Sequence, residues 1–309
     1  MSSIGAAGDP MPTTHHRLRG FYTDGVIRGR SDSRTFADFF HTHADRLSDE
    51  YDRLTVRTIA HAGQLATLQE MGVTIEAAIP LARTDPDLVI AYAGLNGPHR
   101  QVSSERLAAY SNQLGAIRTR NRKDTAHSLP ADWSYGIVSP GASDHLVEGF
   151  VELYKPFDWR TEDTRAILND QANTIAYVQT DEGQLVSTAT AETAQIDIRG
   201  LGMLQLVEIT EASTLPEFQG RGLYRIASHV LAETLATDTS TNAQYSEGNL
   251  RKPGVLIAAH QNGREFNHFD RKDLGPQFGI LPQNFHVNDG SETRQYNDFA
   301  ISYAPLDVQ

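Results

Sequence analysis

Cysteine is absent from all 309 residues of the chain. Its absence excludes disulfide bonds, zinc sites with thiolate ligands and a cysteine nucleophile. Basic residues are also scarce, with 27 Lys and Arg against 39 Asp and Glu, which gives a formal net charge of −12. Because nucleic acids are bound through clustered cations, this balance disfavours a nucleic-acid partner.

Long hydrophobic runs are absent as well. No apolar segment approaches the length that spans a membrane, and the first residues contain no basic segment followed by an apolar stretch. We therefore expect no membrane association and a cytoplasmic location. The twelve histidines form no His-Glu-x-x-His motif, and His41 and His43 would face different sides of a helix. We expect no metal site.

The length suggests about two domains. We expect a flexible tail over 1–17, an N-terminal α/β domain over 18–100, a linker with a helix over 101–132, and a second domain over 133–309. Composition does not fix the oligomeric state, so a monomer or a homodimer remains expected. The apolar spacing in the first domain predicts the following elements: a helix over 36–47, a strand over 54–59, a helix ending at Met71, and strands over 73–79 and 88–95.

The apolar spacing in the second half of the chain predicts strands and helices in the order β-α-α-β-β-β-α-β-α-β-β. Its most informative segment is Leu215–Tyr224, which joins an apolar strand to an amphipathic helix. The first N–H groups of a helix lack internal partners and attract anions. Gly220 and Gly222 would let a phosphate group come close to the backbone. Three antiparallel strands before this loop argue against a dinucleotide-binding Rossmann unit.

The loop Gln219-Gly-Arg-Gly-Leu-Tyr224, placed after the fourth strand, resembles the acyl-CoA signature of the GNAT superfamily of N-acyltransferases. The resemblance covers roughly 134–303 and implies an α/β (α+β) fold: a mixed, mostly antiparallel sheet flanked by helices. It also implies acetyl-CoA as co-substrate. The 18–100 domain resembles the back half of the same fold, as a degenerate β-α-β-β repeat. Tyr224 departs from the signature, which has a small residue there.

Three further stretches resemble the β-lysine N-acetyltransferase subfamily: Tyr154–Phe157, Glu208–Pro216 and Leu281–Asn284. We therefore predict an enzyme that transfers acetyl from acetyl-CoA to the amine of a small molecule, such as a diamino acid. The resemblance implies cofactor contacts from the end of the strand and the loop: Thr214, Leu215, Gln219, Gly220, Arg221, Gly222, Leu223 and Tyr224. Leu215 is expected to bind the pantetheine arm through its main chain.

Acyl transfer to an amine needs a base for the amine proton and an acid for the leaving thiolate. Glu208 lies 11 positions before Gln219, where the resemblance implies the base, and Glu211 is the second candidate because a bulge could bring both to one side. Tyr245 is a candidate acid, with Tyr296 and His260 as alternatives.

Asn284, Tyr296 and Asn297, near the last hairpin, are expected to bind the substrate. Two alternative functions remain open at this point. One is a GNAT-like module that binds acyl-CoA without catalysis, and the other is a peptide or protein N-acetyltransferase, which would need an open groove beside Glu208.

Overall fold

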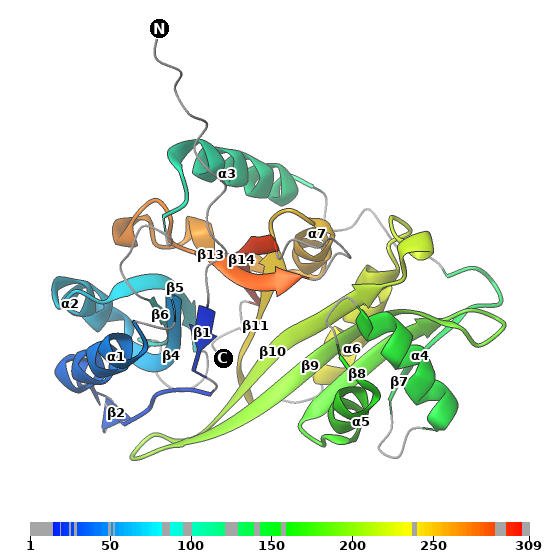
Figure 1. Ribbon diagram of the computed structural model, residues 1–309, viewed down its shortest axis with the longest axis horizontal. Coiled ribbons are helices and arrows are strands. Elements are labelled where there is room, and N and C mark those ends of the chain that lie inside the picture. Colours follow the sequence, from blue (N-terminus) through cyan, green and yellow to red (C-terminus); the bar gives the residue numbers. More distant parts are fainter. Residues whose placement is uncertain are drawn as a thin grey trace, which may run out of the picture.

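The computed structural model describes residues 15–18, 20–24, 26–27, 30–48, 51, 53–81, 87–94, 101–120, 129–138, 143–155, 159–236, 240–287 and 295–304. They form a four-stranded sheet in the N-terminal half and an eight-stranded sheet in the C-terminal half (Figure 1). The fold is mixed α/β, with helices against both sheets, as expected from the sequence.

The N-terminal sheet has the strand order β1-β4-β6-β5. Its strands are β1 (His15–Arg17), β4 (Arg53–His61), β5 (Thr74–Pro80) and β6 (Leu88–Gly94), with α1 (Ser33–Leu47) and α2 (Leu65–Glu70) on one face and a separate small hairpin, β2 (Val26–Ile27) and β3 (Arg30–Ser31). Apolar side chains of α1 recur every four residues at Phe36, Phe40 and Ala44 and are buried against this sheet. β1 lies inside the segment expected as a tail, so the ordered chain begins at least as early as His15.

The C-terminal sheet has the order β12-β14-β11-β10-β9-β8-β7, with β13 paired to β14. Its strands are β7 (Ser134–Ile137), β8 (Asn173–Gln179), β9 (Leu185–Ile198), β10 (Gly202–Thr214), β11 (Thr241–Asn249), β12 (Glu265–Phe266), β13 (Ile280–Val287) and β14 (Gln295–Ala304). The pairs β7–β8, β8–β9 and β9–β10 are antiparallel, whereas β10 and β11 are parallel. Apart from the short β12, the element order is the predicted one.

Four helices pack on this sheet, and a fifth joins them from the linker. α4 (Asp144–Tyr154) and α5 (Thr161–Asn169) lie in front of the strands in Figure 1, and α6 (Leu223–Ala236) lies behind them. α7 (Gly254–Gln261) contacts α3 (Ser104–Arg118), whose Tyr110, Leu114 and Ile117 are buried in a shared core. The helix expected in the linker is therefore part of the packed structure.

The two halves repeat one topology. In the C-terminal half, β10-α6-β11-α7-β13-β14 gives the sheet order β10-β11-β14-β13. In the N-terminal half, β1-α1-β4-α2-β5-β6 gives the order β1-β4-β6-β5. In each half the first two strands are parallel, and the last strand inserts antiparallel between its predecessors. This correspondence supports the interpretation of the N-terminal half as a partial repeat of the C-terminal fold.

The repeat differs at the start of its first long helix. At α1 the position of a bound anion is taken by the Asp32 carboxylate, which accepts hydrogen bonds from the backbone N–H groups of Arg34 (3.1 Å) and Thr35 (3.3 Å). A helix N-terminus that is capped by its own carboxylate no longer offers those donors to a phosphate. Of the two corresponding helix starts, that of α6 is therefore the one suited to an anion.

The two sheets pack face to face through a common apolar core. Its members come from both halves and include Ile59, Ile79, Ile90 and Tyr92 on one side and Leu204, Leu206, Tyr245, Leu281 and Ile301 on the other. Such a shared core makes the halves parts of one packed unit rather than two domains joined by a linker. It also places one face of β10 and β11 directly against the N-terminal strands.

Asn267 holds an edge of this contact. Its side-chain amide accepts from the backbone N–H of Ala78 (3.0 Å) and donates to the carbonyl of Ala78 (2.7 Å), so it replaces a neighbouring strand along β5. The residue is 1% exposed. It therefore satisfies two buried backbone groups that would otherwise lack partners.

We expect Asn267→Leu to lower the free energy of unfolding by about 2–5 kcal/mol, because it leaves two buried backbone groups without hydrogen bonds. Denaturant titration measures this change. Asn169→Leu, at an exposed position at the end of α5, is the matched control and should change stability by less than about 0.5 kcal/mol. Equal effects of the two substitutions would contradict the proposed role of Asn267.

Candidate functional site

β10 and β11 separate at their C-terminal ends. Their parallel pairing runs only as far as Ile209 opposite Ser246, although β10 continues to Thr214 and β11 to Asn249. Beyond Ile209, no described strand pairs with β10 on the side of β11. The unpaired edge opens a wedge between the two central strands, beside the glycine loop. An extended ligand could add its own hydrogen bonds to this edge.

A bulge marks the start of the wedge. Against β9, Thr210 pairs with Thr190 and Ser213 with Thr188, so β10 carries one extra residue at this point. Within the bulge, Glu211 has φ of +43°, which makes it the one non-glycine residue with positive φ among those described. Such a conformation costs free energy and is common at functional sites. The bulge thus redirects the Glu211 side chain from its regular alternation.

The Glu211 carboxyl is poorly solvated. Its Oε2 atom is buried and has no hydrogen-bond partner among the described residues. Burial raises the pKa of Glu211 to about 8, and the nearby carboxylates of Glu192 and Glu208 act in the same direction. A carboxyl group with a pKa in this range can accept a proton effectively near neutral pH.

Glu208 has different surroundings. Arg57 Nη1 donates to its Oε2 at 2.6 Å, and Arg17 Nη2 lies 3.6 Å from its Oε1. Burial alone would raise the pKa of Glu208, but Arg17 and Arg57 outweigh this effect and hold the pKa below its usual value. Glu208 is therefore a weaker base than Glu211, which reverses the order of preference drawn from the sequence.

Tyr245 completes this contact. It lies opposite Glu208 in the β10–β11 register, and its hydroxyl accepts from Arg57 (2.9 Å) and donates to Glu208 Oε2 (3.4 Å). Burial, followed by the charge of Glu208, raises the pKa of Tyr245 well above its usual value. Its proton is thus held in the cluster, which disfavours the role of acid toward a thiolate.

The glycine loop forms a cradle of backbone donors. β10 is followed by a short 3-10 turn (Pro216–Phe218), then Gly220 and Gly222 with φ of +76° and +75°, then α6. No described residue accepts a hydrogen bond from the backbone N–H groups of Gly220 to Tyr224. A Cβ at Gly220 would meet no atom of the described residues within 4 Å, so the loop is open on that side with respect to them. These free donors at a helix start suit an anionic group.

Other predicted cofactor contacts differ in detail. Gln219 donates from its side chain to the Thr214 carbonyl (3.1 Å) and so fixes the loop to the end of β10. Leu215 is buried, its N–H donates to Val186, and its carbonyl accepts from Phe218. The expected main-chain contact from Leu215 to pantetheine is thereby disfavoured, and the free edge at 210–213 is better placed. Arg221 lies over the Phe218 ring and is exposed.

Tyr224 does not fill the cradle. Its ring packs against the core that α6 shares with the sheet, and burial raises the pKa of its hydroxyl. The charge of Arg264, which is also buried, acts in the opposite direction. The bulky residue in place of a small one is thus accommodated on the inner side of the helix, and the loop donors stay free.

The residues expected to bind the acceptor are described only in part. Asn284 lies in β13 and Tyr296 in β14, but their side chains fall outside the described ones. Asn297 is buried. It lies near the C-terminal end of β11, since Phe299, two residues later in β14, pairs with Asn249, the last residue of β11.

His260, the alternative acid, is buried in α7. Its ring stacks near Phe266, and its Nε2 atom lies 3.3 Å from the Arg120 carbonyl. The ring therefore packs within the core around α7, which argues against the role of acid.

Sequence reasoning missed the N-terminal contribution to the site. Arg17 and Arg57 come from β1 and β4, and Tyr92 from β6 donates to Glu247 Oε1 at 3.1 Å. Arg17 Nη2 also donates to Glu247 Oε1, at 2.7 Å. One signal in the sequence was the charged residue Arg57 in the middle of a predicted strand, 54–59, that has no other charged residue, since charged side chains are buried almost only when paired.

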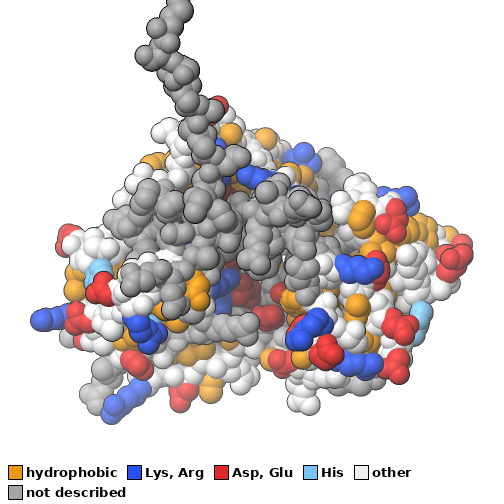
Figure 2. All heavy atoms as spheres, in the orientation of Figure 1, with side chains coloured by type: hydrophobic (Ala, Val, Ile, Leu, Met, Phe, Trp, Pro, Cys, Tyr) orange, Lys and Arg blue, Asp and Glu red, His pale blue; other side chains and the backbone are white. Residues whose placement is uncertain are grey.

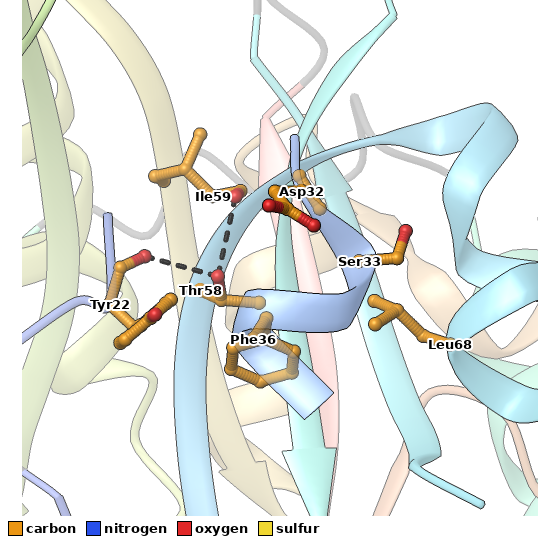
Figure 3. A pocket seen from close by; sticks show the side chains of 8 residues that line it. Tyr22, Asp32, Ser33, Phe36, Thr58, Ile59 and Leu68 are labelled. Atoms are coloured by element: carbon orange, nitrogen blue, oxygen red, sulfur yellow. Dashed lines mark hydrogen bonds between the residues drawn. The ribbon is translucent and has the colours of Figure 1, made fainter. Parts of the chain in front are cut away.

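Figure 2 shows basic and acidic side chains next to each other in a hollow near the centre of the molecule, between the half that carries β4 and the half that carries α4. A separate cavity in the N-terminal half lies between α1, α2 and β4 (Figure 3). Thr58 there donates to the Tyr22 carbonyl at 3.0 Å. With a volume of about 10 Å³, this cavity has room for about one water and is too small for an acceptor or a cofactor.

Among the described residues, no group of three or more His, Asp or Glu side chains could hold a metal ion. In the same part of the chain, no helix combines the length and apolar character needed to cross a membrane.

No protein-family model and no curated protein sequence matches the chain. Solved structures of N-acetyltransferases do resemble it. NAA60 from Arabidopsis thaliana, in complex with a bisubstrate analogue, is 12% identical, with a TM-score of 0.42 over 56% of this chain and 100% of that one. The ribosomal-protein-S18-alanine N-acetyltransferase from Escherichia coli is 12% identical, with a TM-score of 0.41 over 57% and 96%.

The spermidine N-acetyltransferase from Vibrio cholerae, in complex with CoA and spermine, is 14% identical, with a TM-score of 0.40 over 56% of this chain and 95% of that one. These identities and scores carry nothing about activity. The strand order and the glycine loop at α6 are features that the resemblance predicted, and the bulge in β10 was considered from the sequence; the wedge beside β11 is seen only in the structure. The C-terminal half of the chain has the strand order and the glycine loop at a helix start that are expected of a GNAT fold.

Proposed function

We propose that the protein is a cytoplasmic, acyl-CoA-dependent N-acyltransferase that transfers acetyl from acetyl-CoA to the amine of a small molecule, with a diamino acid such as β-lysine as first candidate. The observation that carries this proposal is the juxtaposition of three features: the free backbone donors of the loop, the unpaired edge of β10, and the Glu211 carboxyl at the bulge between them.

Each feature has a separate role in the reaction. The N–H groups of Gly220 to Tyr224 would bind the pyrophosphate of acetyl-CoA, and the edge at 210–213 would bind its pantetheine arm. The thioester carbonyl would then lie in the wedge next to the bulge. This placement would bring the reacting carbon close to Glu211, and such proximity is what acyl transfer requires.

Glu211 is proposed as the general base, in place of Glu208. The acceptor nitrogen attacks the thioester carbon, the Glu211 carboxylate takes the proton that the nitrogen loses, the new C–N bond forms, and the C–S bond breaks. CoA leaves as a thiolate and is protonated from solvent. The raised pKa of Glu211 supports this assignment, because a base is most effective when its pKa lies near the working pH.

A module that binds acyl-CoA without catalysis is the second candidate. One observation favours it: the carboxylate at the expected position of the base, Glu208, is engaged by two guanidinium groups. A peptide or protein N-acetyltransferase is less well supported, since the N-terminal strands cover the side of Glu208 where an open groove would be needed.

Release of CoA decides between these functions. Acetyl-CoA is mixed with native protein and a panel of amines that includes lysine isomers, polyamines and short peptides, and free thiol is measured. Because the chain has no cysteine, a thiol reagent reports CoA alone. We expect release with at least one small amine. Stabilisation by acetyl-CoA without release would identify the protein as a binding module, and the absence of both would contradict acyl-CoA binding itself.

A further inference from the structure

The hydrogen-bond donors of the two arginines beside Glu208 are only partly used. Arg57 donates through Nη1, to Glu208 and Tyr245, and Arg17 donates through Nη2, to Glu247. The Nε atoms of both arginines are buried and have no hydrogen-bond partner in the part of the chain that the structure describes. No described residue forms a hydrogen bond with Arg57 Nη2 or Arg17 Nη1. Neither atom is among the buried atoms that lack a partner, so both are accessible to solvent. With respect to the described residues, each guanidinium therefore keeps a free Nη donor that faces accessible space.

These two cations are close enough to repel each other. Burial acts to lower the pKa of Arg17 and the charge of Arg57 adds to this effect, while Glu247 and Glu208 act to raise it. The exposed fraction of the side chain is 12% for Arg57 and 29% for Arg17. Two neighbouring guanidinium groups, partly shielded from water and with donors to spare, form a geometry that suits a planar carboxylate.

Both arginines contact Glu208, three residues before the proposed base in the same strand, and the charge of one of them, Arg17, reaches Glu211. Glu211 experiences the charge of Arg17, as does Glu192, the partner of Glu208 across the β9–β10 ladder. A compact molecule could thus place its amine at the carboxyl side of the site and an acidic group at the arginines. Glu192 and Glu211 would repel a second acidic group, which favours an acceptor with one carboxylate and at least one amine.

We propose that Arg17 and Arg57, supplied by the N-terminal sheet, bind the carboxylate of the amine acceptor, so that the acceptor is an amino-acid-like molecule. The inference rests on the proposed function, because it assigns a substrate class to the same site. It also gives the N-terminal half a role in the reaction, since its strands β1 and β4 form one wall of the acceptor site while β10 and β11 form the other.

Acceptors that differ only in a carboxylate test this assignment in native protein. Lysine is compared with 1,5-diaminopentane, and ornithine with 1,4-diaminobutane, by the rate of CoA release at saturating acetyl-CoA. Hydrogen bonds to a charged group predict a kcat/KM higher by about 10- to 150-fold for the acceptor with the carboxylate. Equal values, or a preference for the diamines, would overturn the inference while leaving the N-acyltransferase function intact. If no amine releases CoA, the proposed function itself fails.

Substitution then locates the preference. Arg17→Met is expected to reduce the ratio of kcat/KM for lysine over 1,5-diaminopentane by about tenfold or more, mainly through KM, while stabilisation by acetyl-CoA stays unchanged. Arg165→Met removes an equally charged side chain that pairs with Asp144 on α4, and should keep the native ratio. An unchanged ratio in folded Arg17→Met would contradict the assignment. Should that variant fail to fold, the comparison of acceptors in native protein still decides.

Discussion

Glu211→Gln is expected to lower kcat by about 10²- to 10⁴-fold, the usual contribution of a general base. Glutamine keeps the size and polarity of the side chain but cannot accept the proton of the amine. The change should leave acetyl-CoA binding in place, because the free donors of the glycine loop are separate from the bulge. Steady-state CoA release, with acetyl-CoA affinity measured by thermal shift, separates the two effects.

The pH profile gives an independent check. In native protein, kcat/KM should rise with pH and level off above an inflection near 8, because Glu211 must lose its proton before it can act and burial raises its pKa to about 8. Glu211→Gln should lack this inflection, and Glu208→Gln should keep it. If Glu208→Gln abolished the inflection instead, Glu208 would be the base and the order inferred from the structure would be wrong.

The same group links stability to pH. Since the pKa of Glu211 is raised from 4.5 to about 8 on folding, the stability it contributes as a neutral acid is present below about pH 4.5 and is lost as the pH rises through about 8. Glu211→Gln removes this dependence. The melting temperature of the variant should therefore increase relative to native protein between pH 5 and about 8, which would accompany the loss of activity.

Local patterns were sufficient for most of the fold. Helical spacing at Phe36 and Phe40 and alternation along 73–79 predicted elements that the structure contains, because periodic burial follows from the geometry of a helix or a strand. The loop at Gly220 and Gly222 could also be recognised from the sequence, because a strand, two glycines and an amphipathic helix follow one another in the chain.

The chemistry of the carboxylates could not be predicted in this way. Position along β10 selected Glu208, but its pKa depends on Arg17 and Arg57, which lie far away in the sequence, 151 positions in the case of Arg57. The pKa of Glu211 is raised by burial, and its backbone has positive φ. Neither property can be predicted from the local sequence pattern. Long-range packing of the two sheets therefore decides which carboxylate can act as a base.

Gly220→Val is expected to abolish most acyl-CoA binding. Gly220 has φ of +76°, a conformation that a β-branched residue rarely adopts, although a Cβ there would meet no atom within 4 Å. The substitution thus acts through the backbone and turns the loop donors away from the pyrophosphate. Loss of two hydrogen bonds to a charged group, about 3 kcal/mol or more, predicts an affinity lower by about 100-fold or more.

Gly202→Val is the matched control for this prediction. Gly202 begins β10 at the far end of the strand and has φ of +89°, and a Cβ added there would likewise meet no atom within 4 Å. Valine at this position therefore imposes similar backbone strain, of about 1–2 kcal/mol.

Acetyl-CoA at about 100 times its Kd should stabilise native protein and Gly202→Val alike by about 2.7 kcal/mol. In Gly220→Val this stabilisation should fall to less than about 1 kcal/mol, since the ligand concentration then only matches the weakened Kd. Equal stabilisation of both variants would show that the pyrophosphate is bound elsewhere, and the glycine loop would lose its role as the cradle.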